Sequence, residues 1–176
     1  MSLSNSIIRF SNEEEYLRQQ DKKLKKIIDM NGHIVFKPMK KNQFDTLVGI
    51  VISQFISTKA ANSIFKKIRA NFNSKYLNEK QFQNLTIDQI KKLGLSTNKA
   101  KTIKEISEFF LAENVSDLSK LSKQDLNHNL LSIFGIGPWS VNMFEIFSIG
   151  ELDVFSSKDA GLSLIHISEP TRLEPI

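Results

Sequence analysis

Cysteine is absent from the 176 residues, which excludes disulfides, thiolate zinc sites and iron–sulfur clusters. Long apolar runs are absent too, and the first residues lack the basic and then apolar layout of a secretory signal. The sequence contains only one tryptophan and four prolines, and its composition is otherwise ordinary for a globular protein. We therefore expect a cytoplasmic protein, not a membrane protein, whose stability comes from side-chain packing and which holds no metal.

Basic residues outnumber acidic ones, with 24 Lys and Arg against 19 Asp and Glu, for a net charge of +5. A positive surface field attracts polyanions, so nucleic acid is the leading candidate partner. Lysines such as those at positions 22–26 also serve simply to solvate a helix face. Charge by itself leaves both interpretations open.

Apolar residues recur at three- and four-residue spacing through most of the chain, which predicts an all-α fold. The strongest pattern runs from Phe44 to Phe55. An earlier pattern predicts one continuous helix ending at Asn31 and Gly32, followed by an extended stretch from 33 to 39. Capping residues mark the other expected helix starts, which are Ser57 or Thr58, Thr86, Ser96 or Thr97, and Ser122.

The most informative segment is a glycine-rich turn between two helices, formed by Gly135, Ile136 and Gly137 and followed by Pro138. Glycine permits the positive φ of a tight turn, and proline suits the first position of the next helix. The backbone N–H groups of Gly135, Ile136 and Gly137 could then approach a phosphate oxygen, helped by the positive end of that helix. A Gly-x-Gly turn is also an ordinary connection between helices.

The turn and the residues after it resemble the signature of the helix-hairpin-helix (HhH-GPD) DNA glycosylase superfamily. Residues 49–60 and 93–100 resemble the early helix pair and the middle region of its 3-methyladenine DNA glycosylase II branch. The resemblance runs from about Phe44 to Gly161. It implies a two-lobed helical fold and a bacterial monomer that binds double-stranded DNA containing damaged bases. The residues that carry it are Leu131, Phe134 to Val141, Asp153, Val154, Phe155 and Asp159.

The resemblance also assigns roles to individual residues. Asp159 matches the catalytic aspartate beside the sugar of an everted nucleotide, although its local sequence alone favours a carboxylate in the N-terminal turn of a helix. Trp139 and Met143 match the aromatic wall of the base pocket, with a core position as the alternative for Trp139. The loop that enters the gap left by the flipped base matches Gln54, Phe55 and Ile56, and burial of Phe55 is the alternative.

One carboxylate suffices for the chemistry that the resemblance implies. An alkylated purine such as 3-methyladenine carries positive charge and leaves readily, so the group that needs stabilisation is the oxocarbenium-like sugar, which Asp159 would face. Relatives that also cut the strand have a lysine where this chain has Trp139, so we expect a monofunctional hydrolase. No cofactor is expected, apart from a monovalent cation that the family can hold at the hairpin backbone.

Two other classes remain open on the sequence alone. A non-catalytic helix-hairpin-helix module would use the same turn only to hold DNA. A helical protein-interaction domain would show no salt-dependent affinity for DNA.

After Gly161 the sequence departs from the family's pattern, and residues 162–172 resemble a translated sequencing adapter. We expect three parts: an N-terminal helix and short extended segment at 1–40, an incomplete, C-terminally truncated glycosylase domain at 41–161, and a non-native tail at 162–176. On this interpretation the chain as printed would be poorly stable and inactive.

Overall fold

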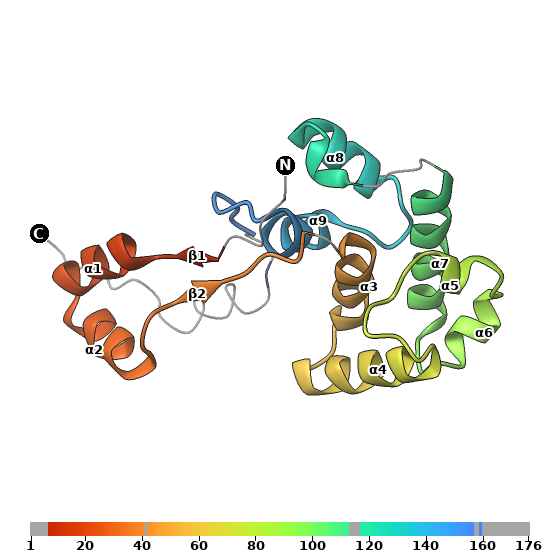
Figure 1. The fold of residues 1–176 in the computed structure, drawn as a ribbon, viewed down its shortest axis with the longest axis horizontal. Coiled ribbons are helices and arrows are strands. Elements are labelled where there is room, and N and C mark those ends of the chain that lie inside the picture. Colours follow the sequence, from red (N-terminus) through yellow and green to blue (C-terminus); the bar gives the residue numbers. More distant parts are fainter. Residues whose placement is uncertain (1–6, 41, 113–116, 157–158, 160–176) are drawn as a thin grey trace, which may run out of the picture.

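The computed structural model describes residues 7–40, 42–112, 117–156 and 159 (Figure 1). Within these ranges the chain is mostly helical, which confirms the predicted all-α class, and the strands form one small ribbon. The elements in chain order are β1 (Ile8–Arg9), α1 (Ser11–Gln20), α2 (Lys22–Asn31), β2 (Val35–Phe36), α3 (Gln43–Ser53), α4 (Thr58–Asn71), α5 (Lys80–Gln83), α6 (Ile87–Lys91), α7 (Thr97–Ala112), η1 (Leu118–Lys120), α8 (Lys123–Leu131), α9 (Pro138–Phe144) and η2 (Glu145–Ile149).

The N-terminal arm contains two helices, so the prediction of one continuous helix was wrong. Asp21 has an extended backbone between them, and its carboxylate accepts hydrogen bonds from the N–H groups of Lys23 (2.6 Å) and Leu24 (3.2 Å). This capping starts α2 anew and turns it back against α1. The apolar periodicity of the sequence continues across Asp21, so it carries no sign of the break between the two helices.

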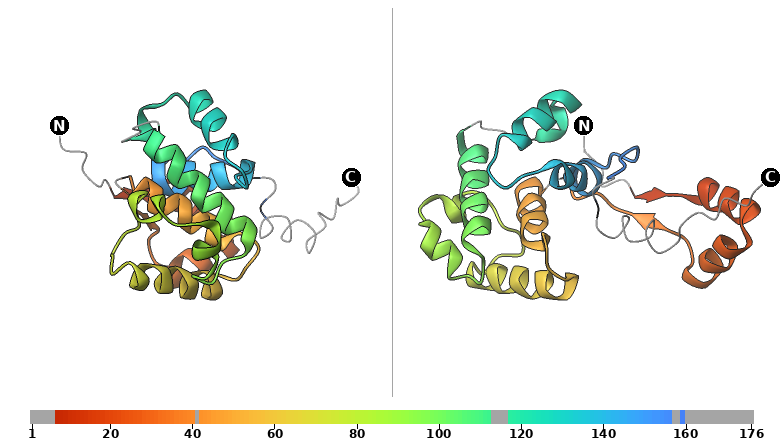
Figure 2. Two further views of the ribbon diagram at one scale, coloured as in Figure 1. Left: turned by 90° about the vertical axis from the view of Figure 1, so that its right-hand side faces the viewer. Right: turned by 180° about the vertical axis from the view of Figure 1, so that it is seen from behind.

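The arm projects away from the rest of the molecule, as Figure 1 and the view from behind in Figure 2 show. The antiparallel ribbon β1–β2 joins it to the helical body, with Ile8 paired to Phe36. Phe36 also packs edge-on against Phe147 (6.0 Å between ring centroids), and the N–H of Met39 donates to the Phe147 carbonyl at 2.8 Å. The π-helical turn η2 is therefore the place where the arm meets the body.

The helical body is built around α3, which packs against α4, α7 and α9. Its side chains Leu47, Val48 and Val51 are completely buried, as are Ile103 and Ile106 on α7. Each such side chain contributes about 1.5–3 kcal/mol by leaving water. The strongly amphipathic pattern of the sequence thus predicted the centre of the core correctly.

Most of the predicted helix starts are confirmed. Ser57 caps α4, Ser122 caps α8, and Thr86 forms a capping box at the start of α6. The short helices α5 and η1 and the π-helical turn were not predicted, because three to five residues carry no periodicity. No helix among the described residues has the length and apolar character that a bilayer crossing needs. The proposed tail at 162–176 lies outside the described residues.

Candidate functional site

The turn between α8 and α9 is fixed against α7. Gly135 has φ +79°, as the sequence predicted for this tight turn, whereas Gly137 has an ordinary φ of −113° and directly precedes Pro138. A Cβ on Gly135 would lie 2.2 Å from Thr102 Oγ1 of α7. Glu105, one turn further along α7, accepts a hydrogen bond from the N–H of Phe134 at 2.9 Å. The hairpin backbone is thus held by two consecutive contacts from one helix.

The three hairpin amides do not all face outward, contrary to the prediction. The N–H of Ile136 donates to the Ile133 carbonyl at 3.1 Å, because the turn closes with an internal bond, and the Ile136 side chain is buried. Within the described ranges, the N–H groups of Gly135 and Gly137 donate to no protein acceptor. Two amides, rather than three, are therefore available for an anion.

Asp159 and Trp139 are brought together by a direct hydrogen bond. The indole Nε1–H of Trp139 donates to Asp159 Oδ2 at 2.7 Å. Trp139 stands in the first turn of α9, and Asp159 follows a turn in which its N–H donates to the Ser156 carbonyl at 3.0 Å. The sequence placed these two side chains in one site by resemblance, but gave no sign of the bond. Residues 157 and 158, which directly precede Asp159, lie outside the described residues.

Trp139 and Met143 line one cavity of about 380 Å³ between α3, α4 and α9. Both side chains are half-buried against the core and also line the cavity, so the base-pocket role of Trp139 stays a prediction. Phe65 and Arg69 of α4 also line this cavity, with the Arg69 guanidinium 4.2 Å from the Phe65 ring centroid. Aromatic rings from α4 and α9 therefore both face the space.

A buried ion pair fixes the α4 wall of this cavity. Arg69 Nη2 donates to Asp45 Oδ2 at 2.6 Å, and the Leu77 N–H donates to Asp45 Oδ1 at 2.7 Å. Because Asp45 is 1% exposed, its charge is compensated by these bonds rather than by water. The pair ties α3 to α4 and holds Arg69 in place. Sequence reasoning did not find it, since the two residues lie 24 positions apart.

The loop after α3 displays Phe55 to solvent. Phe55 has φ +58°, its side chain is fully exposed (101%), and α3 ends at Ser53. The expectation that Phe55 continues the buried apolar face of the helix, which was the alternative to its role in the loop, was therefore wrong. The neighbouring Gln54 side chain donates to the Gly135 carbonyl (3.1 Å) and to Ser140 Oγ (2.9 Å). Ile56, the third residue of the predicted wedge loop, is 37% exposed.

Lys99 of α7 was missed as a functional candidate. Its Nζ donates to the carbonyls of Ile52 (2.7 Å) and Gln54 (2.8 Å), at the end of α3 and directly before Phe55. Burial lowers the pKa of Lys99 below its usual value. Lys99 lies in the first turn of α7, and nothing in the local sequence predicts such a contact.

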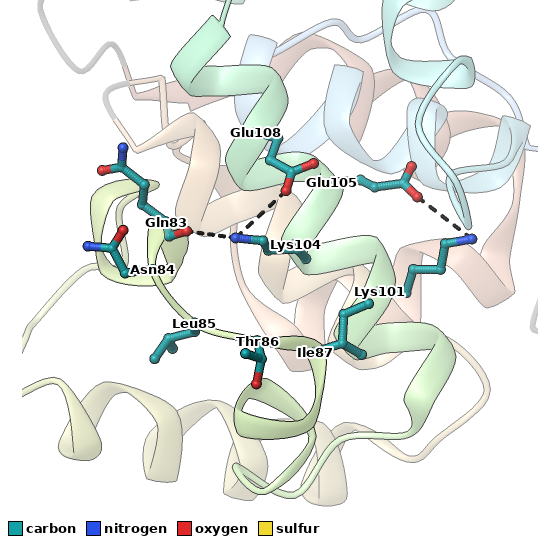
Figure 3. A pocket seen from close by; sticks show the side chains of 9 residues that line it. All are labelled: Gln83, Asn84, Leu85, Thr86, Ile87, Lys101, Lys104, Glu105 and Glu108. Carbon is teal, nitrogen blue, oxygen red and sulfur yellow. Dashed lines mark hydrogen bonds and ion pairs between the residues drawn. The ribbon is translucent and has the colours of Figure 1, made fainter.

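A second cavity lies between α7 and residues 83–87, and Figure 3 shows the side chains that line it. Glu105, which accepts the hydrogen bond from the N–H of Phe134, is one of them. Lys104 spans the cavity, donating to the Gln83 carbonyl at 2.6 Å and pairing with Glu108 at 3.7 Å. Lys101 pairs with Glu105 at 3.9 Å and lies 4.0 Å from the Phe134 ring centroid. The lysines that line this cavity are thus each paired with a glutamate that also lines it.

The carbonyl oxygens of the hairpin are the groups that could bind the monovalent cation allowed by the family resemblance. The Ile133 and Gly135 carbonyls each accept one hydrogen bond, which leaves a second lone pair on each oxygen. Such oxygens fit a hard monovalent cation. No group of three acidic or histidine side chains that could hold a metal occurs in the described part of the chain.

The fold and these contacts define a helix-hairpin-helix protein with an aspartate beside an aromatic cavity. The family described as "HhH-GPD superfamily base excision DNA repair protein" matches residues 48–166, more than half of the chain. The chain therefore belongs to the HhH-GPD superfamily of base excision DNA repair proteins. This confirms the resemblance seen in the sequence.

Individual relatives agree with this assignment. The alkylbase DNA glycosidase-like protein mag2 of Schizosaccharomyces pombe is 25% identical over 155 residues, which cover 85% of this chain and 73% of that protein. The structure of the 3-methyladenine DNA glycosylase Mag1 of the same yeast, in complex with abasic DNA, is 26% identical with a TM-score of 0.73, covering 85% and 75%. A DNA-3-methyladenine glycosidase structure from Bacillus halodurans is 27% identical with a TM-score of 0.66, covering 89% and 73%.

Proposed function

We propose that this protein is a DNA glycosylase that hydrolyses the N-glycosidic bond of alkylated purines such as 3-methyladenine in duplex DNA, as a monomer. The observation that carries the proposal is the hydrogen bond between Trp139 and Asp159, which joins a carboxylate to a residue that lines the aromatic cavity. The names of the relatives support the substrate class. The Mag1 structure, which holds abasic DNA, supports DNA as the partner. That this DNA is a duplex in a bacterial cytoplasm is part of the proposal.

The hairpin holds the DNA backbone in this proposal. The N–H groups of Gly135 and Gly137 donate to a phosphate oxygen, at the positive end of α9. These contacts read no base and position the duplex. A monovalent cation on the hairpin carbonyls would add positive charge beside the DNA phosphate. No chemical step requires this cation.

The wedge loop keeps the damaged nucleotide out of the stack. Eversion costs a few kcal/mol, and an apolar side chain that fills the gap offsets part of this cost. Phe55 suits that task because it is fully exposed on a loop tied to the hairpin through Gln54. A large exposed aromatic with a left-handed backbone is otherwise unfavourable, which supports a functional role.

The chemistry then needs one ionised carboxylate. The cationic purine stacks on the Trp139 side of the cavity, where cation–π attraction favours it over neutral bases. As the bond from the base to C1′ breaks, the base leaves with the bonding electrons, and Asp159 stabilises the cationic sugar. Water then adds to C1′ and loses a proton, which leaves an abasic site. The Trp139 N–H holds the carboxylate toward the sugar.

Duplex DNA carrying 3-methyladenine is expected to release the free base on incubation with the full-length gene product, measured by chromatography of the released bases. The strand should stay intact until alkali is added, and borohydride should trap no covalent adduct, although Lys37 also lines the cavity. Matched duplexes with uracil or 8-oxoguanine serve as controls. Preferential release of either control base would overturn the substrate class, and a trapped adduct the monofunctional assignment.

Replacing Trp139 with phenylalanine keeps an aromatic wall but removes the N–H that holds Asp159. Because hydrogen bonds to charged groups contribute about 1.5–3 kcal/mol, we expect single-turnover excision to fall about tenfold or more. Trp139→Ala removes the wall as well and should cost more. Binding to abasic DNA, which contains no base to stack, is the control and should change little. Equal excision by the Trp139→Phe variant and the unmodified protein would show that the bond has no role.

A further inference from the structure

We infer that Lys99 is a positioning residue that sets the conformation of the wedge loop relative to the hairpin. This inference rests on the proposed function, in which Phe55 enters DNA. Lys99 touches neither the cavity nor the hairpin turn. It acts through the two carbonyls that it binds, those of Ile52 and Gln54.

The end of α3 supplies the acceptors. The last carbonyls of a helix have no partner within the helix and carry its partial negative charge, so a cation is favoured there. The Lys99 ammonium donates to the Ile52 carbonyl at 2.7 Å and to the Gln54 carbonyl at 2.8 Å. Its second acceptor is thus the peptide group immediately before Phe55. A change in this contact would rotate that peptide and redirect the aromatic ring.

Phe55 cannot hold this conformation by its own packing. Its side chain is fully exposed, and a φ of +58° is disfavoured for a residue with a Cβ. The loop conformation must therefore be imposed by neighbours. The side-chain contacts that do so are those of Lys99 from one side and of Gln54, which reaches Gly135 and Ser140, from the other.

One face of α7 contacts both the wedge loop (residues 54–56) and the hairpin turn (residues 135–137) that is proposed to bind phosphate. Lys99, Thr102 and Glu105 follow one another at three-residue spacing, which places them along one side of the helix. Lys99 holds the wedge loop, Thr102 meets Gly135, and Glu105 accepts the N–H of Phe134. The helix therefore fixes the separation between the group that enters the duplex and the turn that grips its backbone.

The test compares three lysine variants of the full-length gene product. Lys99→Met removes both bonds, Lys99→Arg keeps a donor, and Lys104→Met is the matched control. Lys104 lies on the same helix and also donates to a backbone carbonyl, that of Gln83 (2.6 Å), away from the wedge loop (Figure 3). Each variant is also made together with Phe55→Ala. Single-turnover excision, thermal melting, and fluorescence of 2-aminopurine placed beside the lesion are measured.

We expect Lys99→Met to slow excision about tenfold and to reduce the 2-aminopurine signal, since hydrogen bonds to charged groups are among the stronger ones. Lys99→Arg should restore most of both, and Lys104→Met should change excision less than about twofold. In the Phe55→Ala background, Lys99→Met should have almost no further effect, because coupled residues are not additive.

Two outcomes would overturn the inference. If Phe55→Ala slows excision but Lys99→Met slows it further by the same factor, the wedge role stands and Lys99 does not act through it. If Phe55→Ala has no effect, the wedge role itself fails, and the inference with it. A Lys99→Met variant that melts no lower than Lys104→Met excludes general misfolding as the cause of any loss.

Discussion

Replacing Asp159 with asparagine is expected to lower the rate of base excision by about a thousandfold, because removing one group that stabilises developing charge costs this much in other enzymes. Asparagine has nearly the same shape and can still accept the hydrogen bond from Trp139 Nε1, now 2.7 Å from the carboxylate. The side chain therefore keeps its place and loses only its charge. Single-turnover excision of 3-methyladenine from a labelled duplex measures the effect.

DNA affinity should stay within about threefold in this variant, since the grip on the phosphates belongs to Gly135 and Gly137. Fluorescence anisotropy with an abasic duplex checks this point. Unchanged excision would contradict the mechanism and would favour a module that only holds DNA. Loss of binding together with excision would place Asp159 in the interface rather than in the chemistry.

Sequence reasoning located the core and the hairpin because both depend on local pattern. The buried positions of α3, Leu47 and Val51 among them, follow the helical period. The turn at Gly135 could be predicted because its positive φ demands glycine. The roles of Asp159 and Trp139 came only from resemblance, since neither residue type is unusual where it stands.

The contacts that join distant segments could not be predicted in the same way. Lys99 reaches carbonyls 45 and 47 positions away, and the Gln54 side chain reaches Gly135 across 81 positions. Such bonds depend on how α3, α7 and the hairpin pack, which no local pattern encodes. Phe55 was misplaced for a related reason. Its apolar character fits the period of α3, while tertiary contacts from Lys99 and Gln54 end the helix just before it.

Gly135 is expected to be the least replaceable residue of the hairpin. In Gly135→Ala the new methyl group would lie 2.2 Å from Thr102 Oγ1, on a backbone with φ +79°. Overpacking costs about 1–3 kcal/mol and a left-handed alanine about 1–2 kcal/mol, so the free energy of unfolding should fall by about 2–5 kcal/mol. Thermal and urea melts measure this loss. DNA affinity should also fall, because the displaced turn no longer presents its amides together.

Gly137→Ala separates the two effects. Gly137 has φ −113°, and a Cβ there would meet no atom within 4 Å, so alanine should leave the stability nearly unchanged. A methyl group beside the amide nevertheless keeps a phosphate oxygen at a distance, so DNA affinity should still fall. Thr102→Ala added to Gly135→Ala should recover the steric part of the lost stability and leave the cost of the positive φ. If Gly137→Ala binds DNA with unchanged affinity, the duplex is not held by the amides of this turn, and the basic side chains around it must supply the grip.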